Sequence, residues 1–221
     1  MAGANGLVGA SLSRALAAGG EYARVIAITR RPLPFEAPRL VNRILRFEAL
    51  DTELRGVACD DAYCCLGTTL RAAGSPAAFR AVDHDLVLRF ARCAQAGGAK
   101  SLSIVSAAGA TSQSRHLYLQ VKGQTELALE ALRFKALHIM QPSLLLGLRA
   151  DQRTVESVGR LLMPLLNPLL IGRFERWRAI DADVVAAAMR AAVLAGRLGV
   201  HRYVYRALQT LARSGKMPTR M

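Results

Sequence analysis

The chain has 221 residues, 52% of them hydrophobic, and carries a formal net charge of +14. This length and apolar content predict one domain with a sizeable core and leave little room for a second full domain. No run reaches the roughly 18 apolar residues that a membrane span needs, and no basic segment precedes an apolar one at the N-terminus. The basic residues are spread along the chain and only 5% of the residues are aromatic, so no nucleic-acid partner is expected.

The cysteines indicate neither a metal site nor a disulfide framework. They stand at Cys59, Cys64, Cys65 and Cys93, without C-x-x-C spacing and without a histidine cluster. We therefore expect reduced, mostly buried thiols in a cytoplasmic protein.

A glycine pattern opens the chain. It reads Gly3-Ala-Asn5-Gly6-Leu7-Val8-Gly9, and helical spacing of apolar residues follows as far as Gly19-Gly20. Glycines in such a pattern permit a tight turn and let the backbone approach a pyrophosphate, which the helix N-terminus then receives. The apolar run at residues 25–28 follows as the second strand of a dinucleotide-binding fold would. An ordinary glycine turn is the alternative interpretation.

The residues after that run bear on the choice of cofactor. An NAD-preferring site would place Asp or Glu here against the ribose 2′-hydroxyl, whereas this chain has Thr29-Arg30-Arg31-Pro32. Two guanidinium groups suit a 2′-phosphate, so NADP(H) is favoured over NAD(H). A basic loop in a basic protein is the alternative.

Strands and helices alternate along the rest of the chain. The pattern predicts an α/β fold, a Rossmann-like doubly wound parallel sheet with helices on both faces and ligands at the carboxyl ends of the strands. The expected strands are residues 61–66, 101–106 and 137–141, and the expected helices are about 76–96 and 114–132. The first of these strands runs into a small polar turn, so Leu66, Gly67 and Thr68 would line the dinucleotide.

Three residues suggest the chemistry. Tyr118 and Lys122 are four residues apart and share one helical face, while Ser106 ends an expected strand. A lysine cation beside a phenol favours the phenolate and makes the pair a usable proton donor near neutrality. Ser106 would hydrogen-bond a substrate carbonyl oxygen and hold it against the Tyr118 hydroxyl. This is carbonyl reduction or its reverse; an exposed helix pair is the alternative.

Eight segments together resemble one protein family. They are Gly-Ala-Asn-Gly-Leu-Val-Gly (3 to 9), Thr-Arg-Arg-Pro (29 to 32), Cys-Cys-Leu-Gly-Thr-Thr (64 to 69), Val-Asp-His-Asp (82 to 85), Val-Ser-Ala (105 to 107), Tyr-Leu-Gln-Val-Lys (118 to 122), Gln-Pro-Ser-Leu-Leu-Leu-Gly (141 to 147) and Ile-Asp-Ala-Asp-Val (180 to 184). Along nearly its whole length the chain resembles the atypical short-chain dehydrogenase/reductases, in the branch of the Tat-interacting protein 2 oxidoreductase and bacterial epimerase-like proteins. The combination is specific, although no single segment is.

The resemblance implies a role for each matching residue. Tyr118 would donate or accept the proton, Ser106 would orient the carbonyl, and Lys122 would contact the nicotinamide ribose. Arg30 and Arg31 would hold the 2′-phosphate. The pyrophosphate would lie on Gly3, Asn5, Gly6, Leu7 and Val8, and the nicotinamide would lie against Pro142, Ser143, Leu144 and Leu145, with Arg149 as a further phosphate or substrate contact.

Two departures from the family pattern affect these expectations. The family places a hydrophobic central strand before the glycine loop, whereas Met1 stands where that strand would end. We therefore expect a weakened or incompletely paired sheet near residues 1 to 6, with the first strand cut short, because unpaired backbone groups are costly when buried. Relatives also carry Asp before Phe after the third strand, where this chain has Arg46-Phe47, so an adenine contact there is not predicted.

The segment after Gly147 is the least informative. Residues 161–171 are apolar with Pro164 and Pro168 among them, and a cationic stretch follows. Within a single domain spanning residues 1–221, a small region from about 147 to 221 would form a substrate lid, a subunit contact of a homo-oligomer, a peripheral membrane contact, or a helix packed over the sheet edge. Asp181 and Asp183 are expected to begin the next helix as an N-terminal cap.

Two functions remain open at this stage. The first is an NADP(H)-dependent oxidoreductase for a small carbonyl or alcohol substrate, with Ser106, Tyr118 and Lys122 as its catalytic residues and no metal. The second is a non-catalytic NADP(H)-binding regulator or redox sensor that acts through a protein partner. The intact trio favours the first, because a pure sensor would not need the proton donor. Epimerase or dehydratase chemistry is weaker, because little chain after Gly147 remains for a sugar-nucleotide domain.

Overall fold

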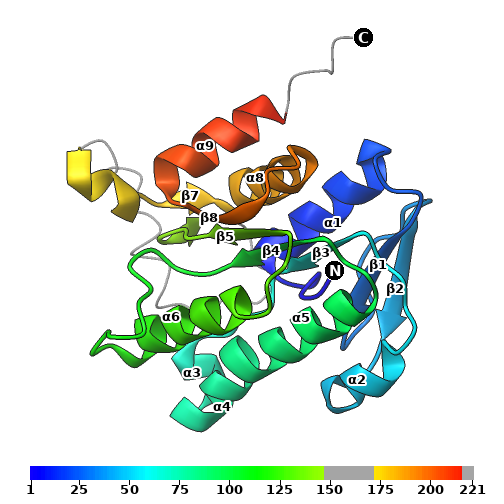
Figure 1. Ribbon diagram of the computed structural model, residues 1–221, viewed down its shortest axis with the longest axis horizontal. Helices are drawn as coiled ribbons and strands as arrows, with labels where there is room; N and C mark the ends of the chain where they lie inside the picture. Colours follow the sequence, from blue (N-terminus) through cyan, green and yellow to red (C-terminus); the bar gives the residue numbers. More distant parts are fainter. Residues whose placement is uncertain (147–171, 216–221) are drawn as a thin grey trace.

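The computed structural model describes residues 1–146 and 172–215, and a parallel sheet organises these residues. Its strands are β1 (Val25–Thr29), β2 (Leu40–Ile44), β3 (Asp61–Cys64), β4 (Ser101–Val105), β5 (Ala136–Met140) and β8 (Gly199–Tyr203). They lie in the order β2-β1-β3-β4-β5-β8, with Ala2 bridging β1 and β3. Every pair is parallel, so the predicted doubly wound sheet is confirmed (Figure 1). A short separate pair joins β6 (Leu145–Leu146) to β7 (Ile180–Asp181).

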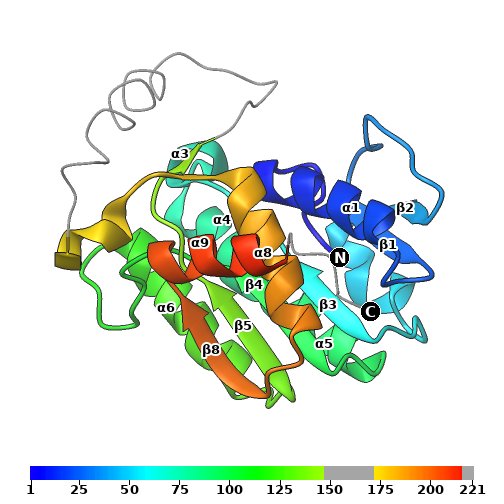
Figure 2. The same ribbon diagram turned by 90° about the horizontal axis from the view of Figure 1, so that it is seen from above.

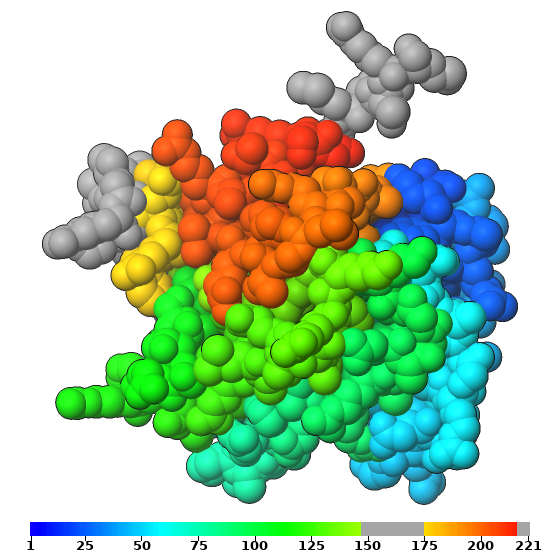
Figure 3. Space-filling view, in the orientation of Figure 1, coloured from blue at the N-terminus to red at the C-terminus, as the bar shows by residue number. Residues whose placement is uncertain are grey.

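Helices cover both faces of this sheet. One face carries α1 (Leu7–Gly19), α8 (Ala182–Leu194) and α9 (Tyr205–Ser214), with α8 between the other two in the view from above (Figure 2). The opposite face carries α5 (Val87–Ala96) and α6 (Leu117–Glu130), with the shorter α2 (Leu50–Glu53), α3 (Leu70–Ala73) and α4 (Pro76–Arg80) and the 3-10 turn η1 (Phe47–Ala49) at its ends. Figure 3 shows the two layers filled by side chains, orange and red above, green and cyan below.

The sheet residues explain why both faces are covered. All five side chains of β5 are buried, as expected for a central parallel strand that packs against helices on either side. Because successive strand side chains point to opposite faces, Leu137 and Ile139 join the core under α5, whereas Met140 joins the core under α1 and α8.

The predicted helices are present, but one contains a π-helical segment and the other begins later than predicted. The stretch from Pro76 to Ala96 is helical throughout, but residues 81–86 between α4 and α5 form a π-helical segment, η2 (Ala81–Leu86). The Ser75 hydroxyl caps its start by accepting from the Ala78 backbone N–H at 3.1 Å. Helix α6 begins at Leu117 rather than at Ser114, because the Ser114 hydroxyl accepts from the His116 backbone N–H at 3.1 Å and holds a turn there.

The sheet is incompletely paired near residues 1 to 6, as the sequence predicts. Among residues 1–146 and 172–215, Ala2 alone bridges β1 and β3: its N–H donates to Tyr63 O and its carbonyl accepts from the Cys65 N–H, both at 2.9 Å. The Ile28 N–H donates to Met1 O at 2.9 Å. Beside Met1, a cavity of about 520 Å³ separates the beginnings of β1 and β3. Among the described residues, no helix has both the length and the hydropathy to cross a membrane.

Candidate functional site

A cavity of about 230 Å³ lies at the carboxyl ends of β3 and β4. This is the edge of a parallel sheet at which ligands bind in open α/β folds. Many of the residues that the sequence singles out line it together, although they come from segments far apart in the chain. They are Gly6, Leu7, Val8, Leu66, Gly67, Thr68, Ser106, Tyr118, Lys122, Pro142, Ser143 and Leu145.

The glycine loop has no room for a side chain at Gly3 or Gly9. A Cβ on Gly9 would lie 2.1 Å from the Gly3 carbonyl oxygen, and a Cβ on Gly3 would lie 2.4 Å from the Cys65 carbonyl carbon. Gly3 therefore packs the loop against the end of β3 and lies outside the cavity lining, and its expected pyrophosphate contact stays a prediction. The first turn of α1 carries no acidic residue and no side-chain cap, so its backbone N–H groups suit the pyrophosphate of a dinucleotide.

The two arginines expected to hold a 2′-phosphate lie on the surface beside this loop. The Asn5 amide donates to the Pro32 carbonyl oxygen at 3.3 Å and so links the loop to the turn that carries Arg30 and Arg31. Both arginines are exposed, and the Arg30 guanidinium lies 5.4 Å from the Phe47 ring centroid. Asn5, Arg30 and Arg31 are outside the cavity lining.

Lys122 is held by a buried carboxylate. Its ammonium lies 2.8 Å from Asp83 Oδ1, and Asp83 Oδ2 accepts from the Thr68 backbone N–H at 2.7 Å. Burial lowers the Lys122 pKa, but the negative charge of Asp83 and the adjacent Tyr118 outweigh it, so the pKa is raised overall. Lys122 therefore remains a cation at the floor of the cavity.

Tyr118 stands one helical turn before Lys122, near the N-terminal end of α6. Its ring packs at 5.6 Å between centroids against the ring of Phe79 on α4. The side chain is half-buried and lines the same cavity as Lys122. The i and i+4 placement on one helical face is the arrangement that the sequence predicts.

Ser106 directly follows β4, and its hydroxyl points to a different partner from the one expected. Its backbone N–H donates to Met140 O at 2.7 Å, which fixes the residue against β5. Its hydroxyl donates to the buried carboxylate of Glu126. A hydroxyl has one hydrogen, and in this structure Glu126 receives it, so donation from Ser106 to a substrate carbonyl would require this bond to break and stays a prediction.

Sequence reasoning missed Asp83 and Glu126 as site residues, although each left a signal. Glu126 is one turn after Lys122 and two turns after Tyr118, on the same face of α6. Asp83 interrupts the apolar face that Phe79 and Leu86 form, and it lies in the π-helical segment η2, a feature frequent at functional sites.

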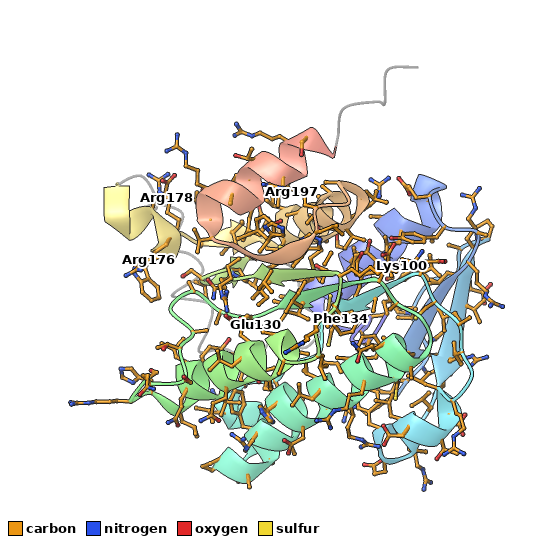
Figure 4. The ribbon with its side chains drawn as sticks, in the orientation of Figure 1. Lys100, Glu130, Phe134, Arg176, Arg178 and Arg197 are labelled. Atoms are coloured by element: carbon orange, nitrogen blue, oxygen red, sulfur yellow. The ribbon has the colours of Figure 1, made fainter. Side chains whose placement is uncertain are left out.

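The residues after β5 lie partly apart from the cavity. The Ser143 hydroxyl donates to the Trp177 carbonyl oxygen at 3.0 Å, and the Trp177 ring packs against Gly109 in the loop after Ser106. Trp177 ends η4 (Gly172–Trp177), near which Figure 4 labels Arg176 and Arg178. Leu144, expected beside a nicotinamide, is 39% exposed and does not line the cavity.

Several expectations lie outside the described residues. Arg149 and the apolar segment 161–171 are among them, so their roles and the lid region from about residue 147 stay predictions. Asp181 occupies the N-cap position of α8, but its side chain makes no capping hydrogen bond. Within residues 1–146 and 172–215, no group of three or more His, Cys, Asp or Glu residues could hold a metal ion.

Comparison with curated proteins reveals relatives over most of the chain, although no protein-family model matches it. Protein HTATIP2 of Rattus norvegicus is 38% identical over 162 residues, which are 72% of this chain and 66% of that protein. The chain thus covers just under two thirds of its length. Mitochondrial protein FMP52 of Saccharomyces cerevisiae is 33% identical over 180 residues, covering 79% and 77% of the two chains. Mitochondrial fmp52 of Aspergillus clavatus is 32% identical over 201 residues, covering 88% and 84%.

Solved structures share the fold at low sequence identity. MoeE5 in complex with UDP-glucose and NAD superposes with a TM-score of 0.66 at 14% identity, covering 92% of this chain and 74% of that one. A UDP-glucose 4-epimerase from Thermotoga maritima has a TM-score of 0.66 at 16% identity, covering 96% and 80%. The dTDP-glucose 4,6-dehydratase DesIV from Streptomyces venezuelae, solved with NAD, has a TM-score of 0.65 at 16% identity, covering 96% and 79%. The relatives and this fold together place the chain in the HTATIP2/FMP52 family of atypical short-chain dehydrogenase/reductases, within the NAD(P)-binding Rossmann superfamily.

Proposed function

We propose that this protein is an NADP(H)-dependent oxidoreductase that interconverts a carbonyl and an alcohol, with Tyr118 as the acid and base. One observation carries the proposal. A single cavity at the carboxyl edge of the sheet is lined by Ser106, Tyr118 and Lys122 together with the glycine loop and the residues after β3 and β5. A proton donor and the loop proposed to bind the dinucleotide thus line one cavity, which is suited to a small substrate.

The proposed roles follow from the contacts. Tyr118 would give its proton to the carbonyl oxygen in reduction and take one from the alcohol in oxidation. Lys122, held cationic by Asp83 at 2.8 Å, would stabilise negative charge on the Tyr118 oxygen. Gly6, Leu7 and Val8 would hold the pyrophosphate at the start of α1. A bound nicotinamide cofactor would supply or accept the hydride.

NADP(H) is the proposed cofactor, and the support comes from Arg30 and Arg31. Both MoeE5 and DesIV were solved with NAD, so the fold alone is compatible with either dinucleotide. The two guanidinium groups stand after β1, and Asn5 joins their turn to the glycine loop. This is where a 2′-phosphate on the adenosine ribose would meet positive charge.

A reducing compartment, the cytoplasm, is the proposed location. The four cysteines are free thiols, and burial raises the pKa of Cys64 to about 11, which keeps it unreactive at neutral pH. The fungal relatives are named as mitochondrial proteins, so fractionation of tagged full-length protein is the measurement that decides between these locations.

Calorimetric titration with NADPH and NADH tests the cofactor site, followed by a screen of carbonyl compounds with NADPH. We expect selective NADPH binding and oxidation of NADPH by at least one carbonyl. NADPH binding without turnover of any compound would support the regulatory alternative. Absence of binding to either dinucleotide would contradict the proposed cavity.

Replacing Arg30 and Arg31 together by alanine tests the 2′-phosphate assignment. Each charge-assisted hydrogen bond contributes about 1.5–3 kcal/mol, so the ratio of NADH to NADPH dissociation constants should fall by about tenfold or more. NADH affinity should stay the same, because NADH has no 2′-phosphate. The control is Arg43→Ala, an exposed arginine on β2; an unchanged ratio in the double variant would refute the assignment.

A further inference from the structure

A chain of polar side chains runs behind Ser106, away from the cavity and towards solvent. Glu126 on α6 is 3% exposed and accepts hydrogen bonds from three side chains. One comes from the Ser106 hydroxyl, two come from Gln141 Nε2 at 2.9 and 3.1 Å, and one comes from Arg202 Nε at 3.1 Å. Arg202, on the edge strand β8, also donates to Glu130 at the end of α6, which Figure 4 labels.

Every group around the Glu126 carboxyl is therefore a donor. An ionised carboxylate only accepts hydrogen bonds, and the guanidinium of Arg202 and the amide nitrogen of Gln141 only donate them. Of these three groups, only the Ser106 hydroxyl can either donate or accept a hydrogen bond. Because the carboxylate can only accept, the hydroxyl donates to it. Since the single hydroxyl hydrogen is used by Glu126, Ser106 has only lone pairs to offer towards the cavity that it lines.

We propose that Glu126 is a positioning residue that turns Ser106 into a hydrogen-bond acceptor, so that the site selects substrates with a hydroxyl group beside the reacting carbonyl. The inference rests on the proposed oxidoreductase function. Tyr118 would donate to the carbonyl oxygen, and the neighbouring substrate hydroxyl would donate to Ser106. The favoured substrate class is thus an α-hydroxy ketone or aldehyde, or the corresponding vicinal diol in the reverse direction.

Replacing Glu126 by glutamine should reverse the polarity of Ser106. Oε2 of Glu126 accepts from Arg202 Nε and Gln141 Nε2, which can only donate, whereas Oε1 accepts from Gln141 Nε2 and from the Ser106 hydroxyl, which can reverse its direction. The introduced amide would therefore place its oxygen at the Oε2 position, beside the guanidinium. Its NH₂ group would then face Ser106 and donate to the hydroxyl oxygen, while the 2.9 Å hydrogen bond from Gln141 Nε2 to this position would be lost. The Ser106 hydrogen would be released towards the cavity, where it could serve a carbonyl oxygen directly.

The test compares two ketones of similar size, hydroxyacetone and butanone, as substrates with NADPH. In the reduction of hydroxyacetone the keto carbon gains a hydride and its oxygen gains the Tyr118 proton, giving propane-1,2-diol and oxidised cofactor. Butanone has no hydroxyl group and so cannot make the hydrogen bond to Ser106. The wild-type kcat/KM for hydroxyacetone should therefore exceed that for butanone by about tenfold. In Glu126→Gln this ratio should fall to about one or below, and in Ser106→Ala it should fall to about one.

Glu130→Gln is the matched control, because Glu130 contacts Arg202 from the next turn of α6 but does not touch Ser106. The ratio in this variant should equal the wild-type ratio. A purely structural role for Glu126 would lower kcat/KM for both ketones equally and leave the ratio unchanged, which would overturn the proposal. A fall of the same size in Glu130→Gln would also overturn it.

A second measurement separates this inference from the proposed function. Urea unfolding of Ser106→Ala, Glu126→Gln and the double variant should be non-additive, with the double variant no less stable than Glu126→Gln alone. The pair Ser106→Ala and Glu130→Gln should be additive. If wild-type protein reduces other carbonyl compounds but not hydroxyacetone, the proposed substrate class is overturned, whereas turnover of no carbonyl compound at all would overturn the oxidoreductase function. Additivity of Ser106 and Glu126 would separately show that the hydroxyl is not committed to the carboxylate.

Discussion

Lys122 shows how single residues set the character of this site. Lys122 is only 6% exposed, and burying its ammonium is costly unless a charge of opposite sign compensates it. Asp83 supplies that charge at 2.8 Å and is itself fixed by the Thr68 backbone N–H. The lysine that would support Tyr118 thus depends on a residue from a different helical segment. Two predictions separate the chemical role of Tyr118 from the structural role of the Lys122–Asp83 ion pair.

Tyr118→Phe removes the proposed proton donor and leaves the ring that packs against Phe79. Because general acid catalysis contributes about 10²–10⁴-fold, turnover of a carbonyl substrate should fall by at least about 100-fold. The NADPH dissociation constant, measured by calorimetry, should change little. Turnover equal to that of the wild type would exclude Tyr118 as the acid.

Asp83→Asn breaks the buried ion pair. Burial, which lowers the Lys122 pKa, would no longer be offset by a carboxylate, so the variant should lose about 3 kcal/mol or more in free energy of unfolding. Urea denaturation measures this loss. Combining it with Lys122→Met removes the stranded ammonium and should recover part of the stability. A double variant no more stable than Asp83→Asn would show that the uncompensated charge is not the cause.

At the scale of elements, α6 is placed by its only glycine. A Cβ on Gly123 would lie 2.2 Å from the carbonyl carbon of Thr111, so the helix lies directly on the loop that follows β4. The Thr125 hydroxyl lies 2.9 Å from Asp83 O and 2.8 Å from Val121 O, within hydrogen-bond distance of both η2 and its own helix. These two contacts set where Tyr118, Lys122 and Glu126 stand relative to Ser106.

Gly123→Ala should therefore displace α6 from the loop. Overpacking of this kind typically costs about 1–3 kcal/mol, so a loss in that range or above is expected in urea unfolding. Carbonyl turnover should fall by about tenfold or more, since small misplacement of positioned groups is costly. Leu127→Ala on the same helix is the control, because Leu127 is 53% exposed. Wild-type turnover in Gly123→Ala would mean that the close approach is unimportant.

These elements also show how far sequence alone can lead. The glycine loop, the Tyr118 and Lys122 pair and the strand ending at Ser106 were predictable, because each is a local pattern with a known geometric consequence. The bond from Ser106 to Glu126 joins residues 20 positions apart through tertiary packing, so no local pattern reveals it. Strand β8 escaped prediction because an exposed edge strand with His201 and Arg202 has no apolar run.

At the scale of the whole molecule, β8 closes the sheet through a ring cluster with β5. His138 is fully buried, its Nδ1 lies 3.2 Å from the Tyr203 hydroxyl, and its ring stacks on His201 at 5.6 Å between centroids. Burial, together with the nearby His201 and Arg197, lowers the pKa of His138 to about 4. The central strand and the edge strand are thus joined by an imidazole that the fold keeps neutral.

This cluster predicts how global stability changes with pH. The folded pKa of His138 lies below its ordinary value of 6.5, so between pH 6.5 and about 4 the unfolded chain binds more protons than the folded one. Stability should therefore fall as pH falls through that window, by on the order of 3 kcal/mol from this residue, and lose nothing further from it well below the window. Full stability from the neutral imidazole is present above pH 6.5.

His138→Gln keeps a polar side chain beside Tyr203 but cannot titrate. Carboxylates titrate in the same window in both proteins, so the informative quantity is the difference between the urea-unfolding free energies of variant and wild type. We expect the variant to be less stable than the wild type at about pH 7.5, because its fit to the ring cluster is poorer, and this deficit to shrink steadily as pH falls from 6.5 to about 4.

His201→Gln provides the comparison, because His201 is on the accessible edge strand and its replacement should leave most of the pH dependence in place. A difference that stays constant with pH would mean that His138 is not held neutral, and that the joint between β5 and β8 does not respond to pH.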